Sequence, residues 1–427
     1  MNDRMDVIDG SVSITDGRII SIGDVTDRKH DAVLNANGNL LLPGFVQTHV
    51  HLCQTLFRGY ADDLPLMEWL RRRIWPMEAA HTPQSLRTSA RLAAAELLLS
   101  GTTTVLTMET VHDTDAVFET LAESGMRATV GKCMMDADTE VPSRLREQTQ
   151  ASVDESVALW KRWHGAANGR IRAAFAPRFA ISCTRELLES VAALSASHQV
   201  LVHTHASESR EEIEMVRRLS GRSNVEYLDE THLASPLLCA AHCVWVDGPE
   251  QALLAERGVK VMHCPGSNLK LGSGIAPIPE LRAKGVSVSL GADGAACNNH
   301  LDMFDEMRLA SVLQAIRHRP GALKARDVLW MATRDGARAL GLQDEVGSIE
   351  AGKRADVIEV DRKGVHLAPG PDLYSTLVYA TRGTDVRSTI VDGEVLVRDG
   401  ELVRMDRAEV VTEARTAARE LARRAAV

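Results

Sequence analysis

Two pairs of histidines, each spaced two residues apart, carry the strongest chemical signal in the sequence. His49 and His51 form the first pair, and His203 and His205 form the second. In a β-strand, side chains two residues apart leave on the same face, so each pair presents two imidazoles in one direction. Converging imidazoles suit a divalent transition metal. One pair alone is a weak signal, but the two pairs together predict a metal site.

Three further residues extend this set. Glu208 follows the second pair, His242 lies in AAHCVWV, and Asp293 lies in LGADG. Three imidazoles and one carboxylate leave room on a divalent metal for a water, whose pKa falls towards ~7. The segment RIRAAFAPR contains no Lys or Glu that could bridge two metals. We therefore expect a single metal, with Glu208 and His242 free to move protons.

The elements that must position these residues are eight short apolar runs that alternate with helical patterns. This alternation is typical of βα units around a parallel sheet, and an eighth helix is expected at about 303–317. The pattern predicts an α/β protein with a (β/α)8 TIM barrel over residues 44–340 and a long insertion at 52–84. In such barrels the C-terminal ends of the strands form the active site, so residues that close different runs meet there. The runs are 41–51, 102–108, 127–136, 170–178, 200–207, 238–246, 259–267 and 286–294.

Both end regions contain short strand pairs broken by Asp-Gly turns, the chemistry of β-hairpins. SVSITDGRIISIG lies near the start, and ADVIEVD and RSTIVDGEVLVRDGEL lie near the end. Neither region has enough strands for a sheet of its own. We therefore expect one small β-sandwich-like domain built from residues 1–43 plus 341–405. The segment 406–427 has the Ala, Arg and Glu content of a surface helix.

Composition excludes several classes of protein. Of 427 residues, 44% are hydrophobic and 25% are charged, which is ordinary for a folded globular protein. The net charge of −9 gives no basic excess to hold a nucleic acid, so the expected partner is a small-molecule substrate. Seven cysteines without a CxxC pair argue against disulfides and a four-cysteine zinc site. Without an apolar run of membrane-spanning length or a leader pattern, we expect a cytoplasmic protein with no membrane partner.

The chain resembles the amidohydrolase superfamily from about residue 10 to residue 395. The motifs are LLPGFVQTHVH, HTHASE, AAHCVWV, HCPGSNLKLGSGIAPIPEL, SLGADGAACNNHLDMFDEMRLA and GSIEAGKRADVIEVD. Within that superfamily it is similar to mononuclear aminohydrolases, which hydrolyse C–N bonds of cyclic amidines. The members it most resembles deaminate S-adenosylhomocysteine, 5'-methylthioadenosine and 5'-deoxyadenosine. For the quaternary structure we expect a homo-oligomer.

The resemblance also implies roles for individual residues. Zinc or iron(II) would be bound by His49, His51, His205 and Asp293, which selects His205 over His203. Glu208 would hold the purine ring and deliver a proton to a ring nitrogen. His242 would orient the water and assist proton transfer, and Asp293 would pass the proton of the water to the departing ammonia.

Residues for substrate binding are implied in the insertion and on the rim. ADDLPLMEWLRRRIWPMEAA resembles adenosine-type deaminases, in which the residue matching Glu78 binds ribose hydroxyls and Trp69 helps to wall the pocket. A lid helix with a structural tryptophan is the alternative. Lys132 and Arg144, on the loop after the third strand, match cations near the amino-acid tail of S-adenosylhomocysteine, although they could be solvated loop residues. Asn268 is expected on a substrate-side loop after the seventh strand.

Arg178 departs from the methylthioadenosine deaminases, which carry His after the fourth strand. The segment APRFAISC resembles guanine deaminases instead, and Arg presents fixed donors that suit a carbonyl or carboxylate. The alternatives are therefore a deaminase of guanine, another oxo-purine or a pterin, an aminotriazine hydrolase, and a metal-free binding barrel. The remaining chemistry-bearing side chains are expected to be ordinary surface residues, namely His81, His112, His164 and His318.

Overall fold

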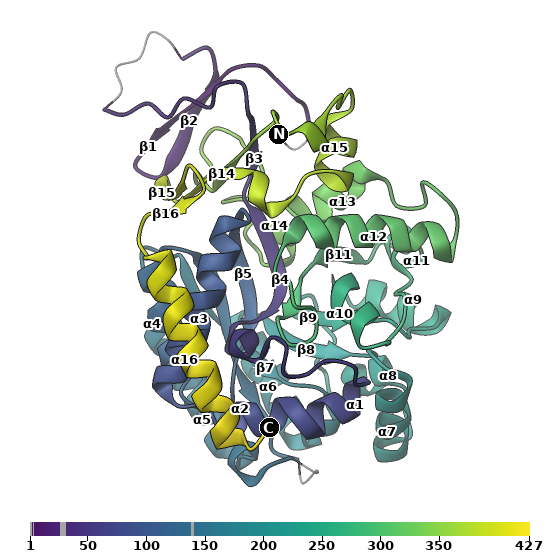
Figure 1. Cartoon of the computed structure of the whole chain (residues 1–427). Helices are drawn as coiled ribbons and strands as arrows, with labels where there is room; N and C mark the ends of the chain where they lie inside the picture. Colours follow the sequence, from purple (N-terminus) through teal and green to yellow (C-terminus); the bar gives the residue numbers. More distant parts are fainter. Residues whose placement is uncertain (1, 3, 26–30, 138–140) are drawn as a thin grey trace.

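The centre of the molecule is a set of parallel strands surrounded by helices (Figure 1). The computed structural model describes residues 2, 4–25, 31–137 and 141–427. The sheet order is β11-β10-β9-β8-β7-β6-β5-β4-β12, and pairing of β12 with β4 completes the ring. The prediction of a (β/α)8 barrel is confirmed. The strands are β4 (Phe45–His51), β5 (Thr102–Met108), β6 (Arg127–Met134), β7 (Ile171–Pro177), β8 (Val202–Ala206), β9 (Leu238–His242), β10 (Lys260–His263), β11 (Ser287–Leu290) and β12 (Asp293–Gly294).

Helices cover the outside of the ring, so the strands are buried on both faces. Every residue of β4, β5 and β6 is buried, as expected for a parallel sheet covered by helices. The expected eighth helix is confirmed at its expected limits, as α12. The helices are α3 (Pro83–Leu99), α4 (Asp115–Ser124), α5 (Thr149–Trp163), α6 (Arg185–His198), α7 (Arg210–Ser220), α8 (Asn224–Glu230), α9 (Gly248–Glu256), α10 (Pro265–Lys270), α11 (Ile278–Ala283), α12 (Met303–Arg317), α13 (Ala325–Met331) and α14 (Arg334–Ala339).

Several of the expected runs differ from the observed strands. The run 286–294 is divided into β11 and β12, and the run 238–246 ends at His242 as β9. The run 41–51 is divided at Gly44 into β3 (Leu40–Pro43), which joins the small sheet, and β4. A side chain at Gly44 would meet the Thr103 side chain at 2.2 Å, so the chain can pass from one sheet to the other only at a glycine. The run 259–267 ends early, because α10 begins at Pro265, a residue that favours the first turn of a helix.

The two end regions of the chain form a small β unit, as expected. One hairpin pairs β1 (Ser11–Thr15) with β2 (Arg18–Gly23), and both residues of its Asp16-Gly17 turn have positive φ. That geometry gives the tight turn that Asp-Gly favours. The other sheet has the order β16-β15-β14-β13-β3. Its later strands are β13 (Val357–Val360), β14 (Val386–Val391), β15 (Glu394–Arg398) and β16 (Glu401–Leu402).

A buried apolar cluster joins the hairpin to the larger sheet through Ile19, Val357 and Ile390. The limits of the small domain at residues 43 and 341 remain a prediction. Short helices α15 (Leu373–Tyr379), η5 (Val365–Leu367) and η6 (Gly383–Asp385) lie within this C-terminal part of the chain.

The insertion after β4 forms a helical segment beside the mouth of the barrel. It consists of η1 (Leu52–Phe57), α1 (Leu66–Trp69), the π-helical turn η2 (Leu70–Ile74) and α2 (Trp75–Ala79). The π turn precedes Pro76, which lacks the N–H of a regular helix. The last helix, α16 (Arg407–Ala425), lies along α3 (Figure 1), and Arg91 of α3 pairs with its Glu409 and Glu413. Within the described ranges, no helix has the length and apolar content needed to cross a membrane.

Candidate metal and active site

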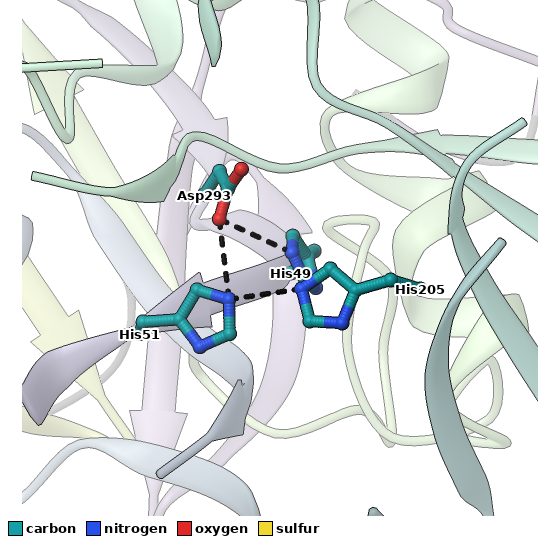
Figure 2. Close-up of side chains that lie close together, drawn as sticks. All are labelled: His49, His51, His205 and Asp293. Atoms are coloured by element: carbon teal, nitrogen blue, oxygen red, sulfur yellow. Dashed lines mark hydrogen bonds and ion pairs between the residues drawn. The ribbon is translucent and has the colours of Figure 1, made fainter. Parts of the chain in front are cut away.

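Four side chains converge at the C-terminal end of the barrel (Figure 2). His49 and His51 come from β4, His205 from β8 and Asp293 from the start of β12. One donor atom of each lies within 4.8 Å of the others. Asp293 Oδ1 is 3.3 Å from His49 Nε2 and 3.2 Å from His51 Nε2. This set of three imidazoles and one carboxylate forms a metal site.

Hydrogen bonds at the far side of the imidazoles show that the site fits a cation. His51 Nδ1 donates to the Met108 carbonyl oxygen at 2.7 Å, and His205 Nδ1 donates to that of Arg178 at 2.8 Å. Because a carbonyl only accepts, both Nε2 atoms carry lone pairs. These Nε2 atoms lie 3.2 Å apart, and His49 Nε2 is buried without a hydrogen bond to any described residue. Lone pairs that face one another at this distance fit a bound metal, and the far-side hydrogen bonds orient the rings.

The second histidine pair divides into one ligand and one support. His203 Nε2 and His49 Nδ1 share a hydrogen bond of 2.6 Å, and His203 is fully buried. His203 is not among the four grouped ligands, whereas His205 is. His203 therefore lies behind His49, whereas His205 faces the other ligands.

At His51, burial is outweighed by the hydrogen bond and the charge of Asp293, which raise the pKa of this imidazole. Burial favours the neutral form of His49 and His205, which is the form that binds a metal. It lowers the pKa of His49 to about 4. Burial and the neighbouring His49 and His51 also hold the pKa of His205 well below its usual range. Burial opposes ionisation of Asp293, but its contacts with His49 and His51 outweigh burial and hold its pKa well below the usual range. The site thus offers the nitrogens of three imidazoles and one carboxylate anion.

Glu208 and His242 stand beside the metal ligands. His242 Nε2 lies 3.5 Å from Glu208 Oε2 and 3.8 Å from Asp293 Oδ2. Burial, followed by the negative charges of Asp293 and Glu212, raises the pKa of Glu208 well above its usual range. His242 and Asp293 both have positive φ, at 72° and 63°. A non-glycine residue in this region is strained, and such strain is common where a side chain is aimed for function.

Helix α10 supplies one hydrogen-bond partner for His242 and one for Asp293. Asn268 Oδ1 accepts a hydrogen bond from His242 Nδ1 at 2.9 Å, and Ser267 Oγ donates to Asp293 Oδ2 at 2.6 Å. Asn268 is buried, and it is not among the described residues that line the main cavity. Asn268 therefore lies in a helix and not in the expected loop, because the strand ends at His263 and α10 turns the side chain towards His242. Ser267 was not singled out from the sequence.

A cavity opens beside the metal ligands, and its empty space of roughly 400 Å³ includes the open mouth. The insertion walls one side of it, since Leu66, Trp69 and Leu70 line the cavity. Trp69 is 4% exposed, so it lies in the wall and not on the surface. The remaining lining residues are His51, Gln54, Arg178, Phe179, His205, Glu208, Glu212, Leu271 and Asp293.

Two residues that were each expected to contact substrate bind one another. Arg178 Nη1 and Nη2 donate to Glu78 Oε2 and Oε1 at 2.5 and 3.1 Å. Gln54 Nε2 donates to Glu78 Oε1 at 3.1 Å. All three side chains are buried. The pair was not foreseen, because its members lie in the insertion and after β7, 100 residues apart.

The two cations expected after the third strand lie apart from the metal ligands. Lys132 belongs to β6 and not to a loop, so its expected position is wrong. Its buried ammonium bonds Glu147 at 2.7 Å and stands among the possible metal ligands His112, Glu147 and Glu155. Arg144 lies in η3 (Ser143–Leu145) and donates to the His81 carbonyl oxygen at 3.1 Å. Neither residue lines the main cavity within the described part of the chain.

Two buried residues support the metal site in ways that the sequence analysis missed. Glu109 accepts hydrogen bonds from the amides of Leu52 and Cys53, at 3.2 and 2.9 Å, and burial raises its pKa to about 7. Its place directly after a strand run was the available signal. His81 was expected on the surface, which is wrong. It is 2% exposed, it bonds the Cys53 carbonyl oxygen at 2.9 Å, and burial lowers its pKa to about 4.

Comparisons with known proteins agree with this geometry. The model of the amidohydrolase family matches residues 40–396. A 5'-deoxyadenosine deaminase from Methanothermobacter thermautotrophicus is 43% identical over 96% of this chain and 95% of its own. A 5-methylthioadenosine/S-adenosylhomocysteine deaminase from Moorella thermoacetica is 39% identical over 95% and 93%. The crystal structure of an adenosine deaminase from Xanthomonas campestris with bound zinc is 35% identical and matches with a TM-score of 0.90, over 96% and 93%. The chain therefore belongs to the amidohydrolase family.

Proposed function

We propose that the protein is a metal-dependent deaminase of adenine nucleosides with a modified 5' position. The products are the corresponding inosine analogue and ammonia. The observation that carries this proposal is the position of the buried Glu208, which lines the cavity beside the metal ligands and lies 3.5 Å from His242 Nε2. Burial raises the pKa of its carboxyl group well above the usual range, which suits a proton donor. The names of the similar deaminases support the same substrate class.

The metal centre supports hydrolysis at a ring carbon. A divalent metal held by His49, His51, His205 and Asp293 supplies, when bound, a nucleophile derived from water near neutral pH. We favour zinc, because the similar Xanthomonas campestris deaminase contains it, with iron(II) as the alternative.

The chain's own residues then supply the proton transfers. Glu208 holds its proton on the carboxyl group and gives it to a ring nitrogen of the adenine, which makes C6 electrophilic. His242 Nδ1 is bound by Asn268, so its Nε2 is directed towards Glu208 and Asp293 and can orient the attacking water. Asp293 Oδ2 accepts the proton of that water and passes it to the departing ammonia. Trp69 covers the ring from the insertion.

The Arg178–Glu78 pair favours a nucleoside over an oxo-purine base. One N–H of each terminal nitrogen of Arg178 donates to Glu78, so the guanidinium is oriented by a carboxylate of the protein and not by a substrate carbonyl. Both carboxylate oxygens of Glu78 accept hydrogen bonds from the protein and still carry free lone pairs. A hydroxyl of the ribose is a donor that could bind these lone pairs. We therefore assign the ribose end of the substrate to the neighbourhood of this pair.

The test is ammonia release by the zinc-loaded protein across a panel of substrates. The panel contains 5'-deoxyadenosine, 5'-methylthioadenosine, S-adenosylhomocysteine, adenosine, guanine and an aminotriazine. We expect turnover of the adenine nucleosides with a 5' modification and at least ~100-fold lower kcat/KM for guanine, a difference of about 2.7 kcal/mol in transition-state stabilisation. Turnover of guanine or the aminotriazine alone would overturn the proposal.

A further inference from the structure

The Arg178–Glu78 ion pair stands between two cavities. Arg178 lines the main cavity of roughly 400 Å³ beside the metal ligands. Glu78 lines a second cavity of roughly 200 Å³, which none of the four grouped ligands His49, His51, His205 and Asp293 lines. Since the two side chains are in contact at 2.5 Å, each cavity ends where the pair begins. The pair is therefore the partition between the two spaces.

The two side chains that form this partition are buried, and their polar atoms are hydrogen-bonded. The side chains of Arg178 and Glu78 are 5% and 2% exposed. Two hydrogen bonds join them, and Gln54 adds a third on the side of the main cavity. The pair is therefore a fixed part of the cavity wall, because separating its members would leave two buried charges unpaired.

The space behind the partition is polar. Its lining includes His81, His112, Asp113 and Arg144 in addition to Glu78. Arg144 is exposed and His112 is partly exposed, so the second cavity reaches the surface. If the pair opened, a substrate group longer than the main cavity allows could extend into this space and meet polar partners.

We propose that the Arg178–Glu78 pair determines how large a 5' substituent the active site accepts. With the pair closed, the main cavity takes adenine nucleosides with a compact 5' group and disfavours those with an extended polar tail. This inference rests on the proposed deaminase function and deepens it. Both residues act on specificity by shaping the cavity, and neither needs to touch the reacting carbon.

The experiment compares two adenine nucleosides that differ only at the 5' position, 5'-deoxyadenosine and S-adenosylhomocysteine. We expect kcat/KM of the zinc-loaded protein to be at least ~100-fold higher for 5'-deoxyadenosine, a ratio equivalent to about 2.7 kcal/mol. The double variant Arg178→Ser/Glu78→Gln removes the guanidinium together with the charge of its partner, so no unpaired charge stays buried. In this variant the ratio of kcat/KM for 5'-deoxyadenosine to kcat/KM for S-adenosylhomocysteine should fall at least ~10-fold.

Two single variants provide matched controls. Arg178→Lys keeps a cation opposite Glu78, so the preference should stay close to that of the unchanged protein. Leu271→Ala enlarges the main cavity at another part of its wall and leaves the pair intact, so it should not narrow the preference. Melting temperature and zinc content establish that each variant is folded and loaded. If that double variant does not fold, Arg178→Gln/Glu78→Gln carries the test with the same expected direction, because it also removes both charges and keeps more of the side-chain volume.

The outcomes separate the two levels of the proposal. Equal use of both nucleosides by the unchanged protein overturns the partition. An unchanged kcat/KM ratio of the two nucleosides in a folded, zinc-loaded variant that lacks the pair also overturns the partition. In both cases the deaminase function stands. Absence of turnover with every nucleoside overturns the deaminase function, and the partition with it, because no substrate is then left to select.

Discussion

The metal end of the main cavity and the side formed by the insertion are built in different ways. At the metal end, His51 and His205 each leave a strand end and donate to the carbonyl oxygen of an adjoining segment. On the insertion side, Glu78 is held by Arg178, a side chain 100 residues away. The metal end is therefore fixed by the register of the barrel, whereas the insertion side depends on pairs between distant side chains.

This difference indicates which property each region controls. Strand register cannot vary without shifting every neighbouring side chain, so the groups that perform the chemistry have a rigid frame. The insertion contacts the barrel partly through surface pairs such as Arg71–Glu211 at 3.6 Å, whose energies are small. We expect changes at the metal end to reduce kcat, and changes on the insertion side to alter KM and substrate preference.

The largest effect is expected for His49→Ala, which removes one metal ligand and leaves His203 without its partner. Zinc content should fall well below one equivalent, and turnover should drop by a factor on the order of 10³ or more. Elemental analysis and ammonia release measure the two quantities. His318→Ala, which removes an exposed histidine paired with Glu280, is the control and should change neither. A His49→Ala protein with one equivalent of zinc and unchanged turnover would contradict the assignment of His49 as a metal ligand.

Glu208→Gln should give the next largest effect, because it removes the acidic proton while keeping the size of the side chain. We expect kcat to fall by about 10²–10⁴-fold, as for loss of a general acid. Zinc content should stay the same, since Glu208 is not among the four grouped ligands. Glu211→Gln, at an exposed neighbour on α7, is the control. Parallel loss of zinc and activity would make Glu208 a ligand and not an acid.

Asn268→Leu tests whether α10 positions His242. Loss of the acceptor at His242 Nδ1 frees the ring to turn and to change its tautomer, so kcat should fall about 10–100-fold. KM should stay within a few-fold, because Asn268 is not a lining residue of the main cavity. Asn268→Asp retains an acceptor and should keep more of the turnover than Asn268→Leu. Equal losses in both variants would indicate a packing role.

Trp69→Leu is expected to have the smallest effect and tests the other side of the comparison. The change removes apolar area from the cavity wall, worth about 1–2 kcal/mol of binding, so KM should rise roughly 10-fold. We expect kcat to stay within a few-fold. Trp160→Leu, on α5 against His198, removes a similar area elsewhere and should leave KM unchanged. If Trp69→Leu reduced kcat as strongly as Glu208→Gln, the insertion side would affect the chemical step as the metal end does, and the proposed difference between them would be wrong.

The sequence by itself determined most of the fold and the chemical end of the site. Alternation of apolar runs and helical patterns predicts the barrel, because each βα unit can bury its strand only against its neighbours. The Asp-Gly turns predict the hairpins of the small β unit. The two-residue spacing of His49 and His51 predicts that both face one point, and the structure agrees. Such signals are local, since they depend on strand period and turn chemistry alone.

The tertiary structure alone decided contacts that link distant residues. The run LLPGFVQTHVH reads as one strand, yet Thr103 on the next strand requires the glycine at which it divides. Lys132 reads as a loop cation, but strand β6 continues past it and its side chain meets Glu147. Glu78 and Arg178 each read as a substrate contact, yet they bind one another because the insertion folds back over the barrel. Sequence spacing carries no information on such pairs, because their geometry is set by the packing of the whole chain.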